Sequence, residues 1–305
     1  MREAVYFLHV SSSGGSSLCR WAQQQPCARI PTCGANCNLP CAHPWDWRSR
    51  CRPPACPPPE RACRPPHRPS CAALHRYAAR HNLTFFASET VLLRDVGSPP
   101  RPCAHFRHVA LLRQPVERVR RQLERMSATP NSRLRAMMGA PAVFNTSERT
   151  SLMGTPAINN YLTRLLLGEE AFFLPLRAIT DAHCDAAAAM LAEFVAVVPL
   201  DLLDHGGAAH LASVLGWRGL PTHLNTHRRT PASANHTRHA GRRLAARVPA
   251  LSERSVRQLY ELNRCDLRLY NEAARRFQAL RSAGSRRKET VMHNCVHEPS
   301  RPQCS

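Results

Sequence analysis

The chain has 305 residues, enough for one large α/β domain or two small ones, and its 43% hydrophobic content favours a globular fold. Its 42 basic residues face 21 acidic ones, and only one of the 42, Lys288, is a lysine. Such an excess of arginine indicates an anionic partner (nucleic acid, a phosphorylated cofactor, an acidic polysaccharide or a membrane surface), although a codon bias toward arginine explains it equally well. No run of 18 apolar residues occurs, so we expect no transmembrane helix.

Cysteines and glycosylation sequons bear on the compartment. Fourteen cysteines and three sequons, beginning at Asn82, Asn145 and Asn235, favour an oxidising secretory compartment over the cytosol. The short apolar run Val5–Val10 leads into serine and glycine and lacks the length of a signal peptide. We therefore expect a lumenal protein whose amino-terminal anchor is missing from this chain, with a cytosolic location as the alternative.

The first predicted elements form a phosphate-binding unit. Val5–Val10 is typical of a buried strand in a parallel sheet, and it ends in the small-residue stretch Ser11–Gly15. Ser16–Gln25 then has the composition of a helix. Glycines let backbone N–H groups approach an anion, and the helix N-terminus adds partial positive charge, so this order predicts a phosphate site. A Walker A motif is absent, which weighs against a nucleoside triphosphatase.

Residues 26–71 interrupt this pattern and are interpreted as an insertion. They hold twelve of the 26 prolines and eight of the 14 cysteines, without helical or strand periodicity. They contain no C-x-x-C pair, so a zinc ribbon or finger is disfavoured despite His43 and His67. Disulfides are the favoured interpretation, with a low-complexity loop of free thiols or a metal site as alternatives.

Regular elements resume after the insertion. Helices are predicted at 72–81, 116–126, 156–167 with Thr155 as N-cap, 181–193, 208–215 ending at Gly216, and 252–280; strands are predicted at 83–87, 108–112 and 194–198. This alternation indicates an α/β fold with a parallel sheet of about four to five strands and helices on both faces. Ligands are then expected at the carboxyl ends of the strands. We expect one domain over residues 1–280, with a basic, flexible tail at 281–305.

Two motifs that follow strands resemble those of the sulfotransferases that use 3′-phosphoadenosine-5′-phosphosulfate (PAPS). Phe7–Leu18, FLHVSSSGGSSL, is similar to the family's 5′-phosphosulfate loop, F-L-H-x-x-K-x-G-G-T-[ST]-L. Leu112–Arg118, LRQPVER, is similar to its 3′-phosphate motif, R-[DE]-P-x-x-R. Ile158–Arg164 and Leu262–Tyr270 resemble the carbohydrate branch of the Golgi and heparan-sulfate type, including its algal-like members. The resemblance extends from the first strand to near residue 280.

The resemblance implies a P-loop-NTPase-like sheet, a Golgi lumen or membrane location, and transfer of a sulfuryl group from PAPS to a carbohydrate or glycosaminoglycan-like acceptor. PAP leaves, and no metal takes part. The expected PAPS-binding residues are Ser12, Ser13, Gly14, Gly15, Ser16, Ser17, Arg113 and Arg121. Arg113 is expected on the 3′-phosphate, because a forked guanidinium matches a phosphate. Glu89, just after the second strand, is the expected general base, with His9 and His43 as rivals.

Two positions differ from the family pattern. Ser12 stands where the family has a lysine, and Arg121 stands where it has a serine. Arg20 is the nearest candidate to replace the lysine, although an arginine is not its equivalent. The sequence therefore also allows a catalytically impaired relative that binds PAP or a glycan. An arginine-rich nucleic-acid-binding protein is a third hypothesis, disfavoured because no helix-turn-helix, zinc-finger spacing or RNP-type motif occurs.

Overall fold

The computed structural model describes residues 3–31, 35–39, 70–95, 101–127, 156–219 and 253–291. His43, Thr155, the sequons at Asn145 and Asn235, and most of the cysteine-rich insertion lie outside these residues. Asn82, in the remaining sequon, is exposed.

Four parallel strands form the central sheet in the order β2-β1-β5-β6. They are β1 (Ala4–Leu8), β2 (Phe85–Ser88), β5 (Phe106–Leu112) and β6 (Ala196–Pro199). All five residues of β1 are buried, which accounts for its unbroken apolar sequence. Because β2 lies on one side of β1 and β5 on the other, the chain reverses its direction of winding at β1 and β5. In open α/β sheets the carboxyl end of such a pair is the usual ligand site.

Helices surround this sheet. In chain order they are α1 (Gly15–Gln23), α2 (Cys71–Arg80), α3 (Pro115–Ser127), α6 (Tyr161–Leu167), α7 (Glu169–Phe172), α8 (Asp181–Ala192), α9 (Ala208–Leu215), α11 (Glu253–Leu262) and α12 (Arg264–Val291). The short turns η1 (Ala35–Cys37), η3 (Leu200–Leu202) and η4 (Leu203–Gly207), and the antiparallel pair β3 (Arg94–Asp95) and β4 (Arg101–Pro102), complete the described elements. None of the described helices is both long enough and apolar enough to cross a membrane.

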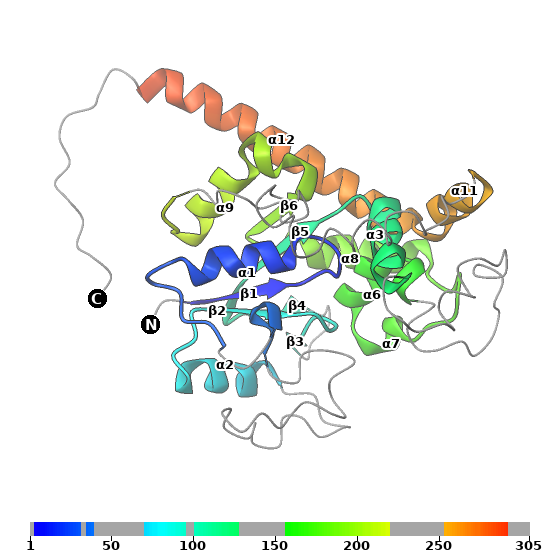
Figure 1. Cartoon of the computed structure of the whole chain (residues 1–305), viewed down its shortest axis with the longest axis horizontal. Coiled ribbons are helices and arrows are strands. Elements are labelled where there is room, and N and C mark those ends of the chain that lie inside the picture. The colour runs from blue at the N-terminus through cyan, green and yellow to red at the C-terminus, as the bar shows by residue number, and fades with distance from the viewer. Residues whose placement is uncertain are drawn as a thin grey trace, which may run out of the picture.

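Two apolar cores lie on opposite faces of the sheet (Figure 1). On one face, α1 and α9 pack over strand residues that include Phe7 and Leu111. On the other, α2, α6 and α8 pack over residues that include Tyr6 and Ala110. Neighbouring strand residues thus enter opposite cores, as the two-residue period of a strand requires. The prediction of an α/β fold with a parallel sheet of about four to five strands and helices on both faces is confirmed, with four strands in the described sheet.

Two predicted helices are each broken. The helix expected at 156–167 is interrupted at Asn160, which adopts a left-handed φ of 48° and precedes α6. The helix expected at 252–280 is divided at Asn263 into α11 and α12. α12 also continues to Val291, beyond the expected end of the domain at residue 280. Hydrogen bonds between residues more than 100 positions apart stabilise both breaks.

Disulfides join elements on both sides of the sheet. Cys19 of α1 is bonded to Cys37 of η1, Cys71 of α2 to Cys103, and Cys184 of α8 to Cys265 of α12. The expectation of disulfides in this chain is therefore confirmed for these cysteines.

Candidate functional site

The candidate site lies where β2, β1 and β5 end. Leu8 and Ser88 are paired in register, so the next residues, His9 and Glu89, leave neighbouring strands side by side. The His9 N–H donates to the Ser88 carbonyl at 2.9 Å. Arg113 directly follows β5 on the other side of β1. The topology thus brings Glu89, His9 and Arg113 to one edge of the sheet.

The loop between β1 and α1 turns through two left-handed residues, Ser12 at φ 64° and Gly14 at φ 87°. A side chain at Gly15 is excluded, because a Cβ there would lie 1.9 Å from Nε2 of His9. The His9 ring thus packs directly on the loop backbone. The glycines are needed here for backbone conformation and for close approach, the two properties that suit a phosphate loop.

At the N-terminus of α1, polar groups have no partner among the residues that the structure describes. Gly14 is the N-cap, and no side chain caps the helix. The side chain of Ser13 is buried, with the residue 1% exposed, and among the described residues its Oγ has no hydrogen-bond partner. Buried hydroxyls are normally satisfied. An uncapped helix start beside such a hydroxyl suits an anion with several acceptor oxygens.

Arg113 contacts this loop directly. Its Nε donates to the carbonyl oxygen of Ser12 at 2.7 Å, and its side chain is only 18% exposed. Nη1 lies 3.9 Å from Oε1 of Glu117, one turn into α3. Burial raises the pKa of Glu117, but the hydrogen bonds and charges of Arg120 and Arg121 outweigh it and hold the pKa below its usual value. Glu117 is therefore a carboxylate that steadies these arginines.

Gln122 is a contact that the sequence did not reveal. Its Oε1 accepts from Oγ of Ser12 at 2.8 Å and from Oγ of Ser11 at 3.3 Å. Ser12, the position of the family's lysine, is therefore tied to α3 rather than left pointing into solvent. Three hydrogen bonds, two to Gln122 and one from Arg113, therefore join the loop to α3 and to the residues that precede it.

Glu89 and His9 form a buried pair. Oε2 of Glu89 lies 3.8 Å from Nδ1 of His9, and the two side chains are 10% and 5% exposed. Nδ2 of Asn38 donates to the same oxygen at 3.4 Å. Asn38 comes from the cysteine-rich insertion, and no sequence pattern connects it with the site.

The other expected ligands lie less centrally. Ser17 is buried at the start of α1, whereas Ser16 is exposed. Arg121 is half-exposed on α3 and pairs with Glu117 at 2.9 Å. Arg20 lies exposed in the last turn of α1, at the end remote from the loop. The structure thus groups Arg113 with the loop more closely than it groups Arg121 or Arg20.

The remaining motifs bind each other. Oδ1 and Oδ2 of Asp266 in α12 accept from the backbone of Thr163 and Leu162 in α6 at 2.9 and 2.8 Å. In return, Oδ1 of Asn160 accepts from Cys265 and Asp266 at the start of α12. The N-terminus of α6 is therefore capped by Asp266 of α12, and that of α12 by Asn160, the residue before α6.

Arg118, the second arginine of the LRQPVER motif, is buried beside this cap. It is 2% exposed, donates to the Ala157 carbonyl, and lies 4.6 Å from the ring centroid of Tyr161. Burial lowers the pKa of Arg118, while the Asp266 charge opposes that shift. Both arginines of the R-x-P-x-x-R motif are thus used, Arg113 at the loop and Arg118 inside the fold.

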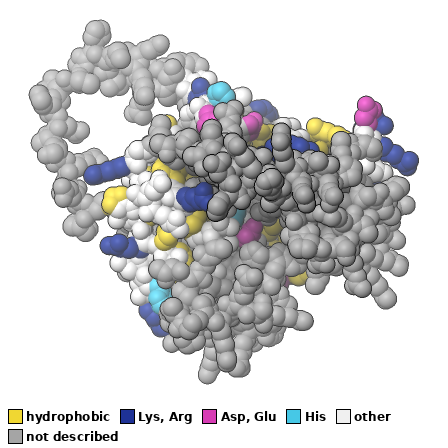
Figure 2. Space-filling model, viewed as in Figure 1, with side chains coloured by type: hydrophobic (Ala, Val, Ile, Leu, Met, Phe, Trp, Pro, Cys, Tyr) yellow, Lys and Arg dark blue, Asp and Glu magenta, His cyan; other side chains and the backbone are white. Residues whose placement is uncertain are grey.

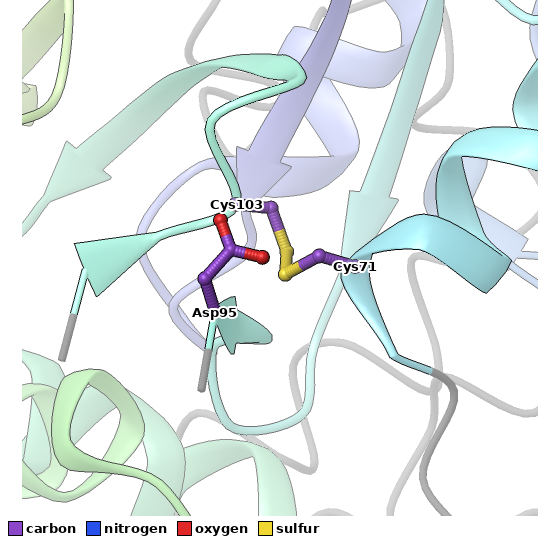
Figure 3. A group of neighbouring side chains, drawn as sticks. All are labelled: Cys71, Asp95 and Cys103. Atoms are coloured by element: carbon purple, nitrogen blue, oxygen red, sulfur yellow. A yellow bond between two sulfur atoms is a disulfide. The ribbon is translucent and has the colours of Figure 1, made fainter. Parts of the chain in front are cut away.

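One group of side chains has the spacing of a metal site. Ligand atoms of Cys71, Asp95 and Cys103 lie within 4.8 Å of one another, but Figure 3 shows the two sulfur atoms bonded to each other. A disulfide offers no thiolate to a metal. The Asp95 carboxylate instead accepts from the N–H of Ala104 at 3.1 Å. This group is a structural crosslink between α2 and the segment before β5.

Basic side chains do not form one patch on the face drawn in Figure 2. Its described surface has arginines at several separate places, among apolar, polar and acidic groups. Some are paired across elements, such as Arg264 with Asp181 at 3.1 Å and Arg268 with Asp185 at 2.7 Å.

The chain matches no protein-family model, no curated protein and no solved structure.

Proposed function

We propose that the chain transfers a sulfuryl group from PAPS to a hydroxyl of a carbohydrate acceptor, in a P-loop-NTPase-like fold and in the Golgi lumen. The observation that carries this proposal is the 2.7 Å contact between Arg113 and the Ser12 carbonyl. It joins the two sequence motifs that resemble the 5′-phosphosulfate and 3′-phosphate sites. They are 101 residues apart in the chain and meet at the carboxyl edge of adjacent strands.

The loop supplies donors for the sulfuryl and leaving phosphate groups. Backbone N–H groups from Gly14 to Ser16, with the hydroxyls of Ser13 and Ser17, surround the uncapped start of α1. Fixed donors of this kind stabilise charge that develops on the transferring group and on the leaving oxygen. The guanidinium of Arg113 binds the 3′-phosphate and holds the nucleotide in line.

Glu89 receives the proton of the acceptor hydroxyl. That hydroxyl oxygen forms a bond to sulfur while the bond from sulfur to the phosphate oxygen breaks, and PAP leaves. His9, 3.8 Å from Glu89, is placed to balance its charge or to take the proton itself. Both side chains are almost fully buried, so little water competes with the acceptor hydroxyl for the carboxylate.

A second candidate is a catalytically impaired relative that binds PAP or a glycan. It is favoured by one observation: the position of the family's lysine is Ser12, whose hydroxyl is bonded to Gln122. A lysine would place a compact, mobile charge on the bridging oxygen, which a serine cannot do.

The two candidates differ in the response to Ser12→Lys. If the chain is an active transferase, the unaltered chain should already transfer labelled sulfate from PAPS to a heparan-type polysaccharide. If it is the impaired candidate, Ser12→Lys should transfer at least about tenfold faster than the unaltered chain, because it restores a charge on the leaving group. PAP affinity should change much less. Ser11→Lys, the neighbouring position with the same Gln122 contact, is the control and should give no gain. Transfer by the unaltered chain at a rate equal to that of Ser12→Lys would exclude the impaired candidate.

A further inference from the structure

A short piece of the cysteine-rich insertion is fixed beside the candidate base. η1 is bonded to α1 through Cys37 and Cys19, and the next residue, Asn38, forms a parallel bridge with Ala87 of β2. The N–H of Leu39 donates to the Ala87 carbonyl at 3.0 Å. Residues 35–39 therefore extend the edge of the sheet next to the point where Glu89 follows β2.

Asn38 presents its side chain to Glu89. The residue is 4% exposed, and its Nδ2 donates to Oε2 of Glu89 at 3.4 Å. An amide nitrogen only donates and a carboxylate only accepts, so the chemistry fixes which end of the amide faces Glu89. Among the described residues, Oδ1 of Asn38 has no hydrogen-bond partner.

We propose that Asn38 is a positioning residue for Glu89 and that the Cys19–Cys37 disulfide holds it in place. This inference rests on the proposed function, in which Glu89 accepts the proton. Asn38 donates to Oε2 of Glu89 from the insertion, and His9, which follows β1, lies 3.8 Å from the same oxygen, so both groups bear on the orientation of the carboxylate. His9 is the titratable group that the described elements place against Glu89.

The backbone of this segment explains why a covalent tie is needed. Asn36 and Cys37 have φ of 59° and 57°, two consecutive residues other than glycine in the left-handed region. Such conformations are unfavourable and persist only where the surroundings hold them. Without the bond to Cys19, the segment would relax and Asn38 would withdraw from Glu89.

The test measures the titration of Glu89 by NMR, in chain labelled with ¹³C at the glutamate carboxyls. The signal is assigned by its loss in Glu89→Gln. Asn38→Leu removes the donor to the charged form, so we expect the titration midpoint to rise by about half to one pH unit. Asn38→Asp should raise it further, because it adds a like charge. Cys37→Ser should raise it as well, whereas the double variant Cys184→Ala/Cys265→Ala, which removes a remote disulfide, should not.

A kinetic readout separates positioning from stability. In Ser12→Lys, adding Asn38→Leu should lower kcat about tenfold and leave KM for PAPS unchanged, because Asn38 acts on the base and not on the nucleotide. If PAP fails to bind any variant, the proposed function is wrong, yet the NMR midpoint still decides the role of Asn38. An identical Glu89 midpoint in the unaltered chain and Asn38→Leu would overturn this inference.

Discussion

Three arginines of the described residues have different structural roles. Arg113 contacts the loop, Arg118 lies inside the fold against Tyr161, and Arg164 is fully buried. The Arg164 guanidinium donates to the carbonyls of Asn159, Ala171, Phe172, Leu174 and Pro175 and to Oδ1 of Asn159. Burial lowers its pKa to about 10. Part of the chain's positive charge therefore stabilises the fold, so net charge alone is a poor guide to its partner.

Ser13 offers a test that separates binding from folding. We expect Ser13→Ala to weaken PAP binding about tenfold without lowering the melting temperature, because the hydroxyl has no partner among the described residues. Calorimetric titration with PAP and thermal unfolding measure the two effects. The control is Ser70→Ala, which removes the N-cap of α2 and should lower stability by about 1 kcal/mol with PAP binding unchanged. Equal PAP affinity in Ser13→Ala and the unaltered chain would remove Ser13 from the site.

At the scale of elements, buried polar side chains stabilise the contact between α6 and α12. Burial raises the pKa of Asp266, while its bonds from Thr163 and Leu162 and the charge of Arg118 oppose the shift. Replacing Asp266 would leave those donors unpaired inside the protein.

We expect Asp266→Ala to lower the free energy of unfolding by about 3 kcal/mol, measured by urea denaturation. The matched control is Glu272→Ala on the same helix, whose carboxylate bonds Arg275 and Arg276 on the surface. This change should cost about 0.5 kcal/mol or less. Similar losses in both variants would contradict the role given to Asp266.

Most helices and strands could be predicted from their hydrophobic period, including β1, α2, α8 and the end of α9 at Gly216, which has a left-handed φ of 66°. The breaks at Asn160 and Asn263 could not. Both positions read as helix locally, and the groups that stabilise each break come from more than 100 residues away. Tertiary hydrogen bonds therefore outweighed local propensity.

The candidate site could be predicted only where its residues have a local sequence signature. Loop glycines and an arginine after a strand have local signatures, so Ser12 to Ser17 and Arg113 could be named. Gln122 and Asn38 contact Ser12 and Glu89 across 110 and 51 residues and belong to no recognisable pattern. Only the folded arrangement reveals them.

At the scale of the whole molecule, His108 in the central strand β5 predicts how stability varies with pH. It is 3% exposed, and burial lowers its pKa to about 4, below its usual 6.5. The folded state therefore favours the neutral form of His108. Its contribution to the free energy of unfolding is fully present above pH 6.5 and is lost as the pH falls toward 4.

Between pH 7 and pH 4, the free energy of unfolding of the unaltered chain should fall by about 3 kcal/mol more than that of His108→Gln, whose side chain does not titrate. Urea denaturation at pH 7, 6, 5 and 4 measures it. If the variant loses stability with pH as steeply as the unaltered chain, then His108 is not the responsible group.

The central claim is that the loop after β1 and Arg113 bind one nucleotide. Calorimetric titration with PAP tests it most directly, in the unaltered chain, in Arg113→Ala, and in the control Arg107→Ala, whose arginine lies six residues earlier on β5, toward its opposite end. We predict one PAP per chain, at least about tenfold weaker binding in Arg113→Ala, and unchanged binding in Arg107→Ala. Absence of PAP binding to the unaltered chain, or equal affinity in both variants, would contradict the account.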